Sequence, residues 1–123
     1  MKSDQDGIAV LPHPFRSLKQ LEKLLAHIDA YEIRNARAST VQNAKAVAIS
    51  SSFKKPLLGS SDAHFSFEAG SVRTRFDRTI NSTDFREIIS KRGRAIVGKE
   101  SNVSVHGLSY ANELVKRFMR ISY

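Results

Sequence analysis

The sequence predicts an α/β fold in which a small, mostly parallel sheet is flanked by helices. The first observation is that short apolar runs alternate with amphipathic stretches through the N-terminal half, with brief connections between them. This strand–helix–strand–helix–strand order is typical of βαβ units. The second observation is that polar residues able to bind ligands follow the predicted strands. The 123 residues, of which 41% are hydrophobic, suit a single domain spanning residues 1–123.

The first predicted strand is the apolar run at residues 8–11, which we expect to be buried. It ends at Pro12-His13-Pro14, because proline cannot donate to a strand ladder. A helix is expected to begin at Ser17, whose hydroxyl forms a capping box with Gln20. Apolar residues then recur at helical spacing as far as Ile28, which predicts one buried stripe.

A second strand is predicted at residues 30–33, with an exit loop at 35–38, and a third strand at 56–59. Between the last two strands lies a helix capped by Ser39 or Thr40. The apolar positions expected on this helix are Val41, Ala44, Val47, Ala48 and Phe53. Three short parallel strands joined by helices therefore form the predicted centre of the fold.

The C-terminal half is expected to contain a strand at residues 72–76, a helix, a short strand at 94–97 and a last helix at 109–121. Ser82 or Thr83 caps the first of these helices, with Asp84 in its first turn and Gly93 just beyond its end. The residues expected on its buried face are Phe85, Ile88 and Ile89. The last helix has an apolar stripe at Leu108, Ala111, Leu114, Val115, Phe118 and Met119.

The amino-acid composition limits the kinds of partner and metal ligand that we expect for this chain. The net charge is +8, from 20 Lys and Arg against 12 Asp and Glu, which indicates nucleic acid or a phosphorylated small molecule. The basic residues are dispersed, so a basic protein without a polyanionic partner is an equal alternative. The chain has no cysteine, so a metal would need His, Asp, Glu or water. No run approaches the ~18 apolar residues of a membrane helix and no signal-peptide pattern is present, so we expect a cytoplasmic protein without a membrane partner.

Three residues form the candidate metal site: His13, Asp62 and His64. Each follows a predicted strand, and the carboxyl ends of parallel strands gather ligand residues at one edge of a sheet. Carboxylate and imidazole together suit zinc, manganese or iron. The alternatives are that His13 is a surface histidine in a turn and that Asp62 opens a turn or caps a helix.

Other polar residues have two interpretations each. Arg34 and Arg37 lie at the end of the second predicted strand and could bind phosphate, or pair with acidic residues on the surface. Glu32 faces either a pocket or an edge, and the sequence does not decide which. We expect His27 to satisfy carbonyl groups at a helix end and His106 to lie in a loop.

The segment Pro56-Leu-Leu-Gly-Ser-Ser-Asp-Ala-His64, together with the His-Pro pair at residues 13–14, resembles the C-terminal portion of the PHP (polymerase and histidinol phosphatase) domain superfamily. The resemblance extends over about residues 7–98, and its segments are residues 7–15, 28–37, 43–45, 56–64, 68–74 and 83–94. It implies a metal-dependent phosphoesterase built on a distorted (β/α)7 barrel. In that family, divalent ions at the strand ends activate water and bind phosphate.

The resemblance also assigns residues. His13 matches a late histidine ligand of the family, whereas Asp62 and His64 match its final ligand pair, and these ligands serve different ions. Glu32 matches the strand motif without an assigned ligand role. Family substrates include histidinol phosphate, nucleotides and nucleic-acid ends.

The family's N-terminal His-x-His motif has no counterpart in these 123 residues. We therefore expect a phosphoesterase portion or subunit that binds metal weakly in isolation and needs a complementary N-terminal half, or a second copy, for full activity. One alternative is a non-catalytic basic module that binds a phosphorylated ligand or nucleic acid. Another is a fragment with little function of its own. Whether the chain is itself an enzyme is left undecided by the sequence.

Overall fold

A computed structural model describes residues 7–17, 21–52, 54–77, 79, 81, 84–90, 94–101, 107–111, 114, 115 and 117. In chain order, the elements are β1 (Val10–Leu11), α1 (Pro14–Ser17), α2 (Leu21–Leu25), β2 (Ala30–Asn35), α3 (Thr40–Ser50), β3 (Leu57–Ser60), a 3-10 turn (Ser66–Glu68), β4 (Val72–Phe76), α4 (Phe85–Ser90) and β5 (Arg94–Gly98). No helix in the described part of the chain has the length and apolar character needed to cross a membrane.

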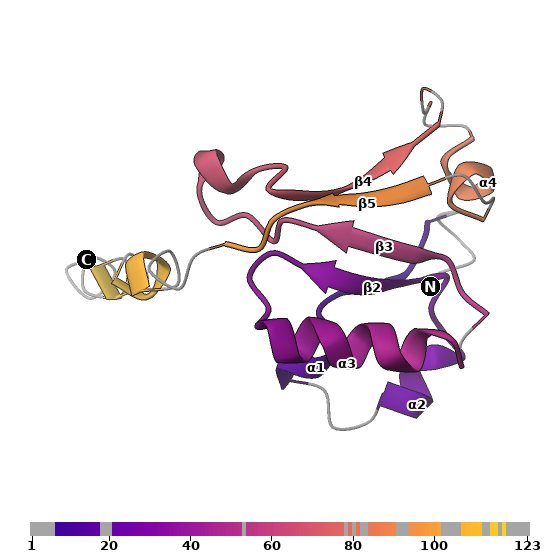
Figure 1. Ribbon diagram of the computed structural model, residues 1–123, viewed down its shortest axis with the longest axis horizontal. Coiled ribbons are helices and arrows are strands. Elements are labelled where there is room, and N and C mark those ends of the chain that lie inside the picture. The colour runs from indigo at the N-terminus through magenta and orange to yellow at the C-terminus, as the bar shows by residue number, and fades with distance from the viewer. Residues whose placement is uncertain are drawn as a thin grey trace.

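The strands form two sheets (Figure 1). The first has the order β1-β2-β3, and both of its pairings are parallel, as the βαβ pattern predicts. The second is the antiparallel pair of β4 and β5. The α/β fold class with a mostly parallel sheet is thus confirmed, and an antiparallel pair is added to it.

A side chain joins the two sheets. The Thr74 hydroxyl on β4 accepts a hydrogen bond from the Gly59 N–H at 2.9 Å and donates to the Gly59 carbonyl at 3.0 Å. The backbone of β3 also approaches β5 closely at Gly59, because a Cβ atom there would lie 2.4 Å from the Ile96 side chain. The antiparallel pair therefore lies directly against the outer edge of β3.

The core lies between the parallel sheet and the helices on one of its faces. Its buried members are Leu11, Ile28, Tyr31 and Ala46, and Phe15, Leu25, Ile33, Ile49 and Leu57 pack against them. Tyr31 on the central strand is fully buried, and burial raises the pKa of its phenol to about 12.

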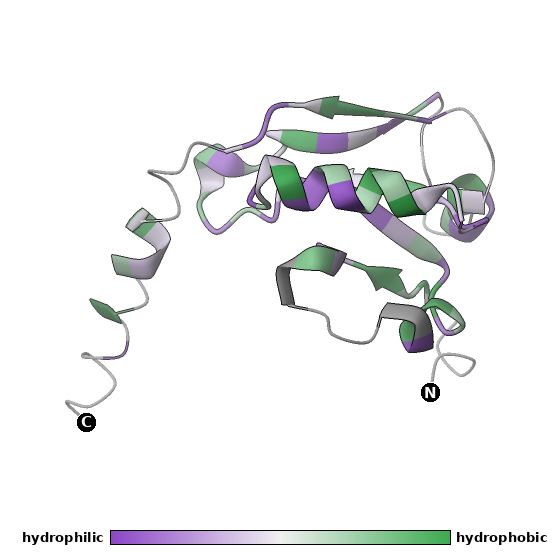
Figure 2. Ribbon diagram, turned by 60° about the horizontal axis from the view of Figure 1, so that its bottom comes forward, coloured by the Kyte–Doolittle hydropathy of each residue, from purple (hydrophilic) through white to green (hydrophobic). Residues whose placement is uncertain are grey.

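The prediction of which face of α3 is buried is wrong. Val41 and Val47 are 64% and 52% exposed, whereas Asn43 and Ala46 are the buried residues. Figure 2 shows hydrophobic residues distributed along α3, so hydropathy alone did not define its inner side. The physical reason is that the Asn43 amide bonds to both backbone groups of Asn35, which orients the helix. Phe53 lies outside the described residues.

Several element boundaries differ from expectation. The first strand is shorter than predicted, and Val10 is 40% exposed because it points to the face of the sheet opposite Leu11, where it lines an open cavity. The first helix begins at Pro14 rather than Ser17, since proline suits the first helical position. Its predicted partner Gln20 lies outside the described residues. The Ser39 cap of α3 is confirmed, with a capping box to Gln42.

The C-terminal region also departs from its predicted packing. Ile88 and Ile89 of α4 are buried, but Phe85 is 41% exposed because it borders an open cavity. Residues 107–111 are helical, and Ser109 is buried while the predicted stripe residues Leu108, Leu114 and Val115 are exposed. The predicted caps Ser82 and Thr83, the predicted helix end at Gly93 and the loop residue His106 lie outside the described part of the chain.

Candidate functional site

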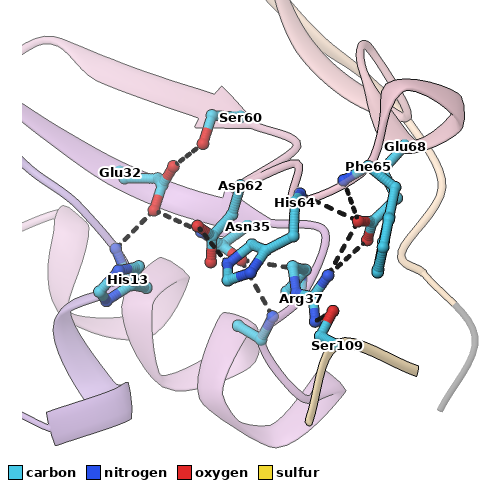
Figure 3. Close-up of polar contacts among 11 residues, drawn as sticks. His13, Glu32, Asn35, Arg37, Ser60, Asp62, His64, Phe65, Glu68 and Ser109 are labelled. Carbon is cyan, nitrogen blue, oxygen red and sulfur yellow. Dashed lines mark hydrogen bonds and ion pairs between the residues drawn. The ribbon is translucent and has the colours of Figure 1, made fainter. Parts of the chain in front are cut away.

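The carboxyl ends of the three parallel strands are joined by the carboxylate of Glu32. It accepts hydrogen bonds from the His13 backbone N–H, from the Ser60 hydroxyl and from the Asn35 amide, the last at 3.1 Å (Figure 3). Glu32 is only 4% exposed, so its three donors replace water around the charge. The orientation that the sequence left open is therefore inward, and Glu32 holds the ends of β1, β2 and β3 at one edge of the sheet.

Two of the predicted metal ligands have left-handed backbone. His13 has φ of 27° and Asp62 has φ of 48°, and they are the positive-φ residues other than glycine in the described part of the chain. Such a conformation costs about 1–3 kcal/mol and persists where the surroundings fix it, often at functional sites. Both residues lie in the connections that follow β1 and β3, two residues beyond the last residue of each strand.

Asp62 and His64 are neighbours in space. Their closest polar atoms, Asp62 Oδ1 and His64 Nε2, are 3.9 Å apart, and the two side chains are 22% and 46% exposed. A carboxylate and an imidazole that both reach solvent can share a cation. Among the residues that the structure describes, however, no group of three His, Asp or Glu side chains could hold a metal ion. The pair fits part of a divalent metal site and does not complete the three-ligand set usual for catalytic zinc.

A buried ion pair lies behind His64. Arg37 Nη1 donates to both Glu68 oxygens, at 2.8 and 2.9 Å, and each side chain is only 2% exposed. The same Glu68 carboxylate accepts the backbone N–H groups of His64 at 3.0 Å and Phe65 at 3.1 Å. Burial alone would raise the pKa of Glu68, but these two backbone donors and the Arg37 guanidinium lower it below its usual value.

Arg34 and Arg37, the two residues predicted to contact phosphate, differ in their exposure to solvent. Arg34 is 36% exposed at its side chain and forms a loose ion pair with Glu100 at 3.6 Å. Arg37 is buried, with Nη1 on Glu68 and Nη2 on the Ser109 hydroxyl at 2.6 Å. Phosphate binding by Arg37 would require it to give up these partners, so Arg34 is the more accessible of the two cations.

The sequence did not identify the asparagine network beneath the site. The Asn35 side-chain oxygen accepts the backbone N–H groups of Arg37 and Ala38, which shapes the loop after β2. Asn43 donates to the Asn35 carbonyl and accepts from its N–H, both at 3.0 Å. The helical periodicity gave no signal for it, since Asn43 lies outside the apolar stripe predicted for this helix.

An open cavity of about 450 Å³ adjoins the strand ends. Glu32 and Ser60 contribute to one part of it, together with Pro12 and Ser61, the neighbours of His13 and Asp62. Its remaining lining is largely apolar and includes Val10, Leu58, Val72, Phe76, Phe85 and Ile89. The cavity therefore reaches the residues that precede His13 and Asp62 in the chain, while His13, Asp62 and His64 themselves are not part of its lining.

His27, the remaining described histidine, lies in the exposed turn after α2, away from the strand ends, as expected of a helix-end residue. It is not one of the three predicted metal ligands, His13, Asp62 and His64.

Comparison with protein-family models gives a match. Residues 40–93 fit the family model described as PHP-associated. Searches of curated proteins and of solved structures find no match. The matched segment runs from the start of α3 to just before β5 and contains Asp62, His64 and Glu68. The resemblance predicted from the sequence is confirmed to this extent: residues 40–93 match the PHP-associated model, which is consistent with the C-terminal portion of a PHP-type protein.

Proposed function

We propose that this chain supplies the C-terminal portion of a PHP-type, metal-dependent phosphoesterase site, with His13, Asp62 and His64 as its metal ligands. The observation that carries the proposal is the left-handed backbone of His13 and Asp62, which lie beyond the carboxyl ends of β1 and β3 on either side of β2. Both strained residues are predicted ligands, and strain of this kind is retained where geometry matters for function. The PHP-associated match of residues 40–93 supports the same assignment.

The proposed site needs further metal-ligand atoms from a complementary PHP segment, which lies on another chain or in another part of the same protein. The described residues provide a pair of neighbouring donors, Asp62 and His64, rather than a complete set. Nitrogen and oxygen donors of this kind suit zinc, manganese or iron. Arg34, partly exposed beside the strand ends, is the proposed contact for a substrate phosphate.

Metal binding by the chain alone tests the ligand assignment. We expect Mn²⁺ to broaden the NMR signals of His13, Asp62 and His64 selectively and saturably. His64→Ala or Asp62→Asn should abolish the effect at the Asp62–His64 pair, whereas the matched control His27→Ala, in the exposed turn after α2, should leave it unchanged. Broadening centred on His27, or spread evenly over acidic residues, would contradict the assignment.

Activity tests the dependence on a complementary segment. The chain alone is expected to hydrolyse p-nitrophenyl phosphate poorly, and addition of a PHP segment carrying a His-x-His motif should restore hydrolysis. The restored activity should disappear in His64→Ala. Hydrolysis by the isolated chain at the rate of the mixture would show that no complement is needed.

A second candidate function is binding of a polyanion without catalysis. The specific observation in its favour is that Arg73 and Arg75 are both exposed and lie two residues apart on β4, so they share one face of the strand. Affinity for a single-stranded oligonucleotide measured against salt would test it, because phosphate contacts give a steep dependence. A flat dependence, or equal affinity in the Arg73→Gln and Arg75→Gln double variant, would exclude this role.

A further inference from the structure

We propose that Arg37 and Glu68 are positioning residues that fix the backbone of the loop after β3 and thereby hold His64 beside Asp62. This inference rests on the proposed function, because it takes His64 to be a metal ligand. It gives Arg37 a role different from the phosphate contact that the sequence suggested, and it gives Glu68 a role where the sequence suggested none.

Glu68 reaches the loop through a single carboxylate oxygen. Its Oε2 accepts the consecutive N–H groups of His64 and Phe65, at 3.0 and 3.1 Å. Strand β3 has already ended at Ser60, so the ladder of the sheet does not fix the backbone at His64. Because two adjacent peptide groups are held by one buried acceptor, Glu68 sets the position from which the His64 imidazole extends.

Arg37 in turn holds Glu68 from the loop after β2. Its Nη1 bonds to both carboxylate oxygens, and its Nη2 donates to Ser109, 72 residues further along the chain. The planar guanidinium is therefore oriented from two sides, which a lysine could not reproduce. The line of contacts runs from Ser109 through Arg37 and Glu68 to the amide of His64 (Figure 3).

Two substitutions separate positioning from a general contribution to stability. Glu68→Gln keeps the size of the side chain and one acceptor oxygen but removes the charge. Arg37→Met keeps much of the volume and removes every donor. The matched control is Arg86→Met, which removes a 47% exposed arginine of α4 from its 3.8 Å ion pair with Asp29.

The full chain and its folded variants are titrated with Zn²⁺ alone, and NMR follows the His64 ring together with the amides of His64 and Phe65. In both variants we expect the Kd for Zn²⁺ at His64 to rise about 10-fold or more, as happens when an outer partner of a metal ligand is removed. Arg86→Met should leave the Kd unchanged. Without metal, both amides should lose hydrogen-exchange protection, and the cross-peak between the His64 ring and the Asp62 β-protons should weaken.

An unchanged Zn²⁺ affinity in folded Glu68→Gln and Arg37→Met proteins overturns the positioning role, and so does full retention of amide protection. If the wild-type chain binds no Zn²⁺ at His64, the proposed function fails, and the amide exchange and the His64–Asp62 cross-peak still decide the positioning role. If Arg37→Met does not fold, Arg37→Lys replaces it, with the charge retained and the forked geometry lost, and the same readouts apply.

Discussion

The backbone N–H of His13 donates a hydrogen bond to the side-chain carboxylate of Glu32, 19 residues later in the chain. This contact joins the loop after β1 to the central strand of the parallel sheet. The same carboxylate also receives the Ser60 hydroxyl from the end of β3. One buried acid thus holds together the strand ends that carry His13 and Asp62.

Glu32→Gln is therefore expected to destabilise the fold by about 1–3 kcal/mol, because its buried donors would lose a charged acceptor, and hydrogen bonds to charged groups contribute more than those to neutral ones. The free energy of unfolding in urea measures this loss. Asp77→Asn, at an exposed position just after β4, is the control and should change the stability by less than about 0.5 kcal/mol. Equal stability of the Glu32→Gln protein and the wild type would show that the carboxylate does not join the strands.

Thr74→Val should loosen the junction between the two sheets. It removes the hydroxyl that bonds to both backbone groups of Gly59 and keeps the shape of the side chain. We expect a loss of about 1–3 kcal/mol and faster hydrogen exchange at the Gly59 amide. Thr74→Ser, which retains the hydroxyl, should preserve the slow exchange. If Thr74→Ser exchanges as fast as Thr74→Val, the hydroxyl is not the connecting group.

Gly98→Ala and Gly70→Ala form a pair that separates steric contact from backbone strain. Both glycines have positive φ, of 123° and 79°. A Cβ atom at Gly98 would lie 1.9 Å from the Ser71 carbonyl oxygen, whereas one at Gly70 would meet nothing within 4 Å. Gly70→Ala should cost about 1–2 kcal/mol from its conformation alone, and Gly98→Ala clearly more. Thermal denaturation ranks the two, and a smaller loss for Gly98→Ala would contradict the close packing of β5 on Ser71.

Stability should fall at high pH because of Tyr31. Burial raises the pKa of its phenol from 10.0 to about 12 in the folded chain. A raised folded pKa favours folding below the unfolded pKa, and the contribution is lost as the pH rises from 10.0 towards about 12. Unfolding free energies of the wild type and Tyr31→Phe across this range should diverge, with the wild type losing more. Parallel curves would mean that the Tyr31 phenol titrates alike in both states.

The sequence predicted most of the parallel sheet because apolar runs, prolines and helix caps are local signals. It also placed His13, Asp62 and His64 at strand ends, since strand boundaries are visible in the pattern. It did not predict which face of α3 is buried, because a tertiary contact decides that orientation: the Asn43 amide pairs with the backbone of Asn35. For the same reason the Arg37–Glu68 pair was missed, as nothing local relates residues 31 positions apart.

The most direct test of the proposed ligand assignment is a crystal structure of the chain grown with millimolar Zn²⁺, with the metal located by anomalous scattering. A zinc peak is expected within about 2.0–2.2 Å of an Asp62 carboxylate oxygen or a His64 ring nitrogen, at the edge where the parallel strands end. A peak at His27, with none beside His13, Asp62 or His64, would contradict the assignment of the metal-binding face.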